Sequence, residues 1–122
     1  MKFKESKPIY LQIADRICDE ILQGKYKEEE RIPSLREYSS TVEVNAHTVV
    51  RSFDYLQGQD IIYNKRGLGY FVAQSGRERI LELRKEVFLR DELPEFFRQL
   101  KTLDIPLKDV EKMYKDYLKI ND

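Results

Sequence analysis

Several residue types are scarce in this chain of 122 residues, and their scarcity narrows its possible functions. A single cysteine, Cys18, excludes an internal disulfide and a cysteine metal cluster. A single histidine, His47, excludes a multi-histidine metal site, so we expect neither a metal nor a cofactor. No run of about 18 apolar residues is present, and no apolar signal segment follows Met1. We therefore expect a cytoplasmic protein that has no membrane association.

Net charge is also lacking, because 22 Lys and Arg residues balance 22 Asp and Glu residues. Residues 1–76 contain 11 basic and 11 acidic residues, and residues 77–122 contain the same numbers. Overall charge therefore gives no support for nucleic-acid binding, and any such function must rest on local charge. The length allows one compact domain, or one domain with a short appendage.

Catalytic motifs are scarce as well. The two closely spaced glycines, Gly67 and Gly69, lie between expected strands, whereas a dinucleotide-binding loop opens a helix. His47 has no serine or cysteine partner at a recognisable spacing. We therefore do not expect an enzyme.

The first part of the chain predicts a helix that runs to Gly24, where a left-handed residue can end it. Ser6 is the expected cap of this helix, and Pro8 suits its first turn because that position needs no N–H. Four isoleucines at spacings of four residues predict one apolar stripe, namely Ile9, Ile13, Ile17 and Ile21.

Two further helices follow a polar, irregular segment at residues 25–33. Ser34 and Glu37 have the spacing of a capping box, which predicts a short helix from Leu35 to about Thr41. Asn45 is a good cap for a helix from Ala46 to about Gln57. Its inward face is expected to carry Val49, Phe53 and Leu56, and its outward face His47, Arg51, Asp54 and Gly58. This pattern is typical of a helix-turn-helix.

A β-hairpin is expected next, with strands at residues 61–63 and 70–72 joined by a turn that contains Lys65 and Arg66. Residues 61–77 contain three basic residues and no acidic residue. A helix-turn-helix followed by a hairpin is a winged helix. The expected fold is therefore mainly α with a small β-hairpin: an N-terminal winged helix-turn-helix at residues 1–75 and a short helical dimerisation segment at residues 76–122.

The C-terminal segment predicts helices at about 78–90, 94–103 and 107–118. Pro94 favours a break or kink near residues 91–93, which leaves open whether residues 78–103 form one kinked helix or two. So short an appendage cannot bury all of its apolar side chains, and packing of two copies is the commonest solution. The expected dimerisation residues are Leu83, Val87, Phe96, Phe97, Leu100, Val110, Met113, Tyr114 and Tyr117.

Local chemistry makes double-stranded DNA the expected partner. The N-terminal residues of a recognition helix face base edges, where Arg pairs with guanine and His donates to a purine acceptor. The residues expected to contact DNA from the helices are Arg36, Asn45, His47, Thr48 and Arg51, and those from the turn of the hairpin are Lys65 and Arg66. The alternatives are a solvated His47, an Arg51 that pairs with Asp54, and turn residues that only increase solubility.

The chain resembles the GntR family of bacterial transcription regulators, and within it the short YtrA-like group. The resemblance rests on four motifs in order across residues 8–73: Pro8–Ile13, Arg31–Glu37, Val44–Arg51 and Gly67–Val72. It implies a dimer that represses by binding a partly palindromic operator, with Arg36, Thr48 and Gly67 as DNA contacts. We expect no large ligand-binding domain in 122 residues. A small-molecule effector would therefore bind within the winged helix, at the dimer interface or through a partner protein.

The sequence departs from the family pattern at a few positions. Glu29 and Asp60 stand where the family usually has glycine, so we expect some backbone strain there. Ala46 and His47 replace a common Pro-Asn pair, which affects base preference. The competing interpretation is a winged helix that binds another protein, which would depend only weakly on salt, whereas DNA binding depends on it steeply.

Overall fold

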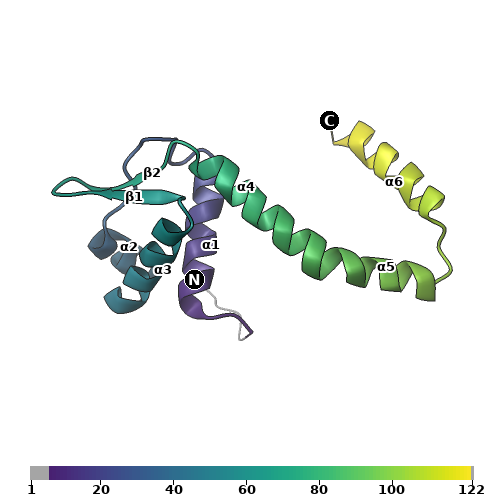
Figure 1. Ribbon diagram of the computed structural model, residues 1–122, viewed down its shortest axis with the longest axis horizontal. Helices are drawn as coiled ribbons and strands as arrows, with labels where there is room; N and C mark the ends of the chain where they lie inside the picture. The colour runs from purple at the N-terminus through teal and green to yellow at the C-terminus, as the bar shows by residue number, and fades with distance from the viewer. Residues whose placement is uncertain (1–5, 122) are drawn as a thin grey trace. The chain divides into compact units, whose positions relative to one another are not determined.

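The computed structural model describes residues 6–121, which form two compact units divided between Glu82 and Leu83. The first unit contains three helices, α1 (Ile9–Leu22), α2 (Leu35–Val42) and α3 (Ala46–Gly58). A hairpin of β1 (Ile62–Lys65) and β2 (Gly69–Val72) and the start of α4 (Gly76–Val87) complete it. Figure 1 shows the three helices gathered beside the hairpin, as a winged helix requires.

Helix α3 packs against α1, α2 and β1, so it occupies the centre of the first unit. Its inner face is fully buried at Val49, Phe53 and Leu56, as the spacing predicts. The ring of Phe53 meets the ring of Tyr70 of β2 edge to face, with the centroids 4.8 Å apart. This contact fixes the hairpin against the helix.

Helix α1 confirms most of the expected pattern and corrects its beginning. Ile13, Ile17 and Ile21 are buried, together with Ala14 and Cys18, whereas Ile9 is 44% exposed. The predicted cap at Ser6 is wrong, because the helix begins at Ile9 and Pro8 is the residue that precedes it. The carbonyl of Pro8 accepts the N–H groups of Leu11 and Gln12, so the proline itself starts the first turn.

The capping predictions for α2 and α3 are confirmed. Ser34 Oγ accepts the N–H of Glu37, and the Glu37 carboxylate accepts the N–H of Ser34. The bond that the Ser34 N–H donates lowers the pKa of the Glu37 carboxyl group, because it favours the charged form. Asn45 Oδ1 accepts the N–H of His47 at 2.8 Å. Each bond satisfies an N–H that has no partner within its helix.

The ends of the two strands lie within two residues of the predicted ends, and the segment at residues 25–33, described above as irregular, pairs with the hairpin in part. Tyr63 lies opposite Phe71, and Lys65 lies opposite Gly69. On the other edge of β2, the N–H of Ile32 donates to Tyr70 and the N–H of Val72 donates to Glu30, both at 2.9 Å. Residues 29–32 therefore act as a short third strand, which the polar run Glu28–Arg31 concealed.

The second unit contains the rest of α4, a π-helical turn η1 (Phe88–Glu92), α5 (Leu93–Thr102) and α6 (Leu107–Ile120). The backbone stays helical from α4 to α5, so the irregularity expected near residues 91–93 is this π-helical turn and not a break between two helices. Pro94 lacks an N–H and its ring crowds the carbonyl four residues earlier, and the wider turn relieves both problems. The N–H of Leu93 instead donates to Phe88 across five residues.

Apolar side chains of the second unit are largely exposed. Phe96 is 42% exposed and Phe97 50%, and on α6 Met113, Tyr114 and Tyr117 are each more than half exposed. Val87 is also exposed, whereas Leu83, Leu100 and Val110 are half-buried. The separation of the last two predicted helices, at about 94–103 and 107–118, is confirmed, because α5 ends at Thr102 and α6 begins at Leu107.

No helix between Ser6 and Asn121 is both long enough and apolar enough to cross a lipid bilayer.

The backbone is left-handed at the two positions where the GntR family, which the chain resembles, usually has glycine. Glu29 has φ 67° and Asp60 has φ 61°. Asp60 follows the end of α3, where the N–H of Ile61 donates to Leu56 and the N–H of Asp60 donates to Gln57. This is a Schellman motif, which requires a left-handed residue.

Replacing Asp60 by glycine should therefore raise the free energy of unfolding by about 0.5 kcal/mol, since glycine relieves the strain but gains entropy when unfolded. Urea denaturation of the purified protein measures this change. Asp60→Ala is the matched control, because it removes the same charge without relieving the strain. An equal gain in both variants would contradict the conformational explanation.

Candidate nucleic-acid interface

The N-terminus of α3 presents the expected recognition residues to solvent. Asn45, Ala46 and His47 are exposed, and Thr48 is half-buried. The side chain of Asn45 is engaged in capping, so it orients the first turn. The helix N-terminus carries a partial positive charge and free N–H groups, which favour a phosphate.

Two arginines extend this surface from neighbouring turns. Arg36, the second residue of α2, is exposed, and its side chain makes no hydrogen bond or ion pair with any described residue. Arg51, one turn further along α3 than His47, is also exposed. Its guanidinium lies over the ring of Tyr10, 4.2 Å from the centroid, rather than beside Asp54. Both guanidinium groups therefore keep their N–H donors available to a ligand.

The hairpin supplies the remaining basic side chains. Lys65 Nζ lies 4.7 Å from the ring centroid of Phe71 and 5.9 Å from that of Tyr63. Arg66 and Gly67 lie in the exposed turn, which the bond from the N–H of Leu68 to the carbonyl of Lys65 closes at 2.9 Å. In Figure 1 this turn projects away from the helices of the first unit. A projecting basic turn is the part of a winged helix that can reach the DNA backbone.

Glu29 and Tyr63 support the base of the hairpin. Tyr63 Oη donates to Glu29 Oε2 at 2.5 Å. This bond raises the pKa of the Tyr63 hydroxyl, because the neighbouring carboxylate disfavours a second negative charge. The strained backbone at Glu29 is thus held by a side-chain bond that a family glycine would not make.

Arg31 has a structural role that was not predicted from its position in the sequence. It lies between the hairpin and α2: its backbone bridges to Phe71, and its Nη2 lies 3.7 Å from Glu37 Oε1. A Cβ atom on Gly69 would lie 2.9 Å from Arg31 Nε. The sequence did contain one indication of this role, because Arg31 is the first residue of the motif Arg31–Glu37, which includes the capping box.

All eight predicted DNA-contact residues therefore lie in the first unit, on α2, at the start of α3 and on the hairpin, and none is buried. The family model described as "Bacterial regulatory proteins, gntR family" matches residues 9–72, which span these elements. This chain belongs to the GntR family. It is therefore a transcription regulator with a DNA-binding domain and not an enzyme.

Relatives and solved structures agree with this assignment. The HTH-type transcriptional regulator YhcF of Bacillus subtilis is 31% identical, over 89% of this chain and 88% of its own. The HTH-type transcriptional repressor YtrA of the same species is 24% identical, over 93% and 86%. A GntR-family regulator from Bacteroides thetaiotaomicron is 57% identical and superposes with a TM-score of 0.83, over 93% of this chain and 99% of its own.

The DNA-binding domain of AraR in complex with an operator also resembles this chain. The two are 30% identical with a TM-score of 0.54, and the match covers 60% of this chain and 88% of that domain.

Gly69, at the start of β2 in the hairpin, has a backbone conformation that disfavours any side chain. Gly69→Ala should lower the free energy of unfolding by about 1–3 kcal/mol, because φ is +115° and the new methyl group meets Arg31. Gly58→Ala is the control, because Gly58 ends α3 with open space around it, and it should raise stability by about 0.5 kcal/mol. Thermal unfolding followed by circular dichroism compares the two, and equal effects would contradict this account.

Proposed function

We propose that this chain is a cytoplasmic transcriptional repressor that binds a palindromic operator as a homodimer. Residues 1–75 bind the DNA, and residues 76–122 join the two copies. The observation that carries the proposal is the exposed set of polar and basic side chains on the first turns of α3, on α2 and on the hairpin. A repressor role is supported by relatives that are themselves named as repressors, such as YtrA.

The contacts have distinct roles in this proposal. Arg51 and His47 read base edges in the major groove, since Arg donates two parallel hydrogen bonds to guanine. Arg36 and Thr48 hold phosphates or an outer base beside them. Asn45 orients the first turn, while Lys65, Arg66 and Gly67 of the hairpin contact the backbone or the minor groove. Asp54, which phosphate repels, lies further along α3, where the helix leaves the groove.

The homodimer is supported by the apolar side chains that the second unit exposes. Helix α5 presents Phe96 and Phe97, and α6 presents Met113, Tyr114 and Tyr117. An exposed apolar surface of this kind marks an interaction site, and a second copy offers the same surface in return. Two recognition helices would then meet half-sites about 34–36 Å apart, or a multiple of one turn of DNA.

Selection of bound duplexes from a randomised DNA pool tests the proposal. The purified full-length chain should enrich a site with two-fold symmetry, and its affinity should fall steeply as salt rises. No enrichment at low salt from a folded dimer would contradict DNA recognition. A shallow salt dependence would instead indicate a protein-binding winged helix.

Arg36→Ala and Arg51→Ala should each weaken binding to the selected operator by about 1–3 kcal/mol, while the protein stays folded. Lys108→Ala removes an exposed charge from the second unit and should leave affinity unchanged. Fluorescence anisotropy with labelled operator measures each dissociation constant. Unchanged affinity in the Arg36→Ala/Arg51→Ala double variant would contradict the assigned contacts.

Phe97→Glu should convert the dimer into a monomer, because it places a charge within the apolar surface of α5. Light scattering at micromolar concentration should then give the mass of one chain, 14.6 kDa, instead of twice that value. Gln99→Glu adds the same charge at another exposed position of α5 and should remain dimeric. A monomeric wild-type chain would contradict the dimer directly.

A further inference from the structure

Tyr10 and Arg51 form a contact that the proposed roles above do not explain. Tyr10 is in the first turn of α1, and Arg51 is in the second turn of α3, 41 positions later in the chain. The guanidinium carbon lies 4.2 Å from the ring centroid, which is closer than the other cations that lie over aromatic rings in the described residues. The ring of Tyr10 therefore forms a platform beneath the side chain that is expected to read a base.

The backbone of Tyr10 is fixed to the same helix. Ser52, which follows Arg51 and is fully buried, donates its hydroxyl to the carbonyl oxygen of Tyr10 at 2.7 Å. The carbonyl oxygen of Thr48 lies within reach of the same hydroxyl, at 3.2 Å. Tyr10 is thus attached to α3 at two points: its carbonyl contacts Ser52 and its ring contacts Arg51.

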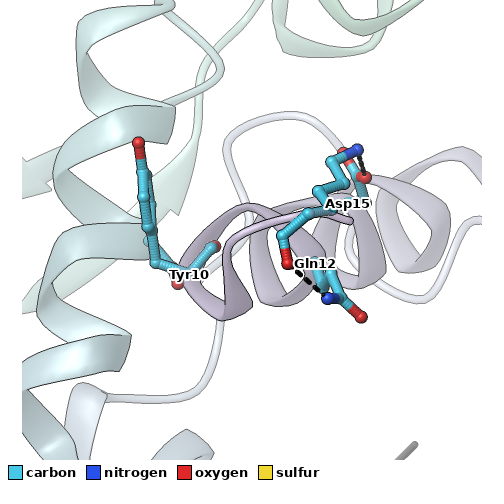
Figure 2. A network of polar contacts seen from close by, with 5 residues as sticks. Tyr10, Gln12 and Asp15 are labelled. Atoms are coloured by element: carbon cyan, nitrogen blue, oxygen red, sulfur yellow. Dashed lines mark hydrogen bonds and ion pairs between the residues drawn. The ribbon is translucent and has the colours of Figure 1, made fainter. Parts of the chain in front are cut away.

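The segment that leads into α1 is braced on its other side. Gln12 Nε2 donates to the carbonyl oxygen of Lys7 at 2.7 Å, and Lys7 pairs with Asp15. Figure 2 shows Gln12 and Asp15 close to these contacts, with Tyr10 pointing away from both. These contacts restrain the backbone at the start of α1, from which the ring of Tyr10 extends.

Such a platform matters for an arginine that reads DNA. A free arginine side chain has many rotamers, and ordering them on binding costs free energy. A guanidinium group that lies over an aromatic ring is restrained without a hydrogen bond, so its N–H groups stay available for a bidentate contact with guanine. No carboxylate of the described residues pairs with these N–H groups of Arg51.

We propose that Tyr10 is a positioning residue that holds the guanidinium plane of Arg51 and thereby sets base discrimination at the position that Arg51 reads. This inference rests on the proposed DNA-binding function. It assigns to α1 a part in sequence recognition, although Tyr10 need not touch a base.

A double-mutant cycle tests the inference with full-length protein and the selected operator. Tyr10→Leu removes the ring, and Tyr10→Phe is the matched control that keeps the ring and removes the hydroxyl. Tyr10→Met serves as a second ringless variant if Tyr10→Leu does not fold. Each substitution is made with Arg51 and with Arg51→Ala, and dissociation constants are measured on the operator and on duplexes changed at one base pair.

Tyr10→Leu should weaken operator binding about twofold to fivefold, the range expected for loss of an exposed cation–π contact. It should also relax discrimination at the same base pair as Arg51→Ala, whereas Tyr10→Phe should match the wild type. With Arg51→Ala present, Tyr10→Leu should have no further effect. The same loss with and without Arg51 would overturn the inference, and so would unchanged binding by both ringless variants.

The outcome for Arg51→Ala alone separates the two proposals. If this variant binds the operator with unchanged affinity and discrimination, the proposed contact of Arg51 fails. If it loses both while the ringless Tyr10 variants lose neither, only the role of Tyr10 fails.

Discussion

The burial of one face of α3 determines where the candidate DNA contacts on that helix lie. Val49, Phe53 and Leu56 are each no more than 1% exposed, and Phe53 also meets Tyr70 of the hairpin. Removing a buried phenylalanine costs about 3–5 kcal/mol, so the helix has little freedom to rotate. Because side chains repeat every 100° along a helix, fixing this face inward fixes His47 and Arg51 outward.

The hairpin is held in place by a second set of constraints. Residues 29–32 bond along one edge of β2, and Arg31 fills the space beside Gly69 up to Glu37 of the capping box. The bond network that begins α2 is therefore continuous with the one that supports the wing. A substitution at Gly69 should therefore affect both the hairpin and the start of α2.

Local signals predicted the elements whose cause lies within a few residues. The capping box at Ser34, the cap at Asn45 and the left-handed positions at Glu29 and Asp60 follow from short-range chemistry or family motifs, and the structure contains all four. A long-range effect was missed: residues 29–32 pair with β2, and their polar sequence carries no signature of this pairing. Pro94 marked the position of an irregular helix turn, but its form, a π-helical turn in a continuous helix, was not predicted.

A chain without net charge gains little from long-range attraction to DNA, so its affinity depends on a few well-directed cations. Two of these cationic side chains are restrained in the same way. Arg51 lies over Tyr10, and Lys65 lies over Phe71 and Tyr63, so aromatic rings rather than carboxylates hold both side chains. A carboxylate partner would neutralise the charge that phosphate or guanine must meet, whereas a ring restricts the side chain and leaves its charge intact. In the proposed interface, the aromatic residues of α1 and the hairpin would support recognition as well as folding.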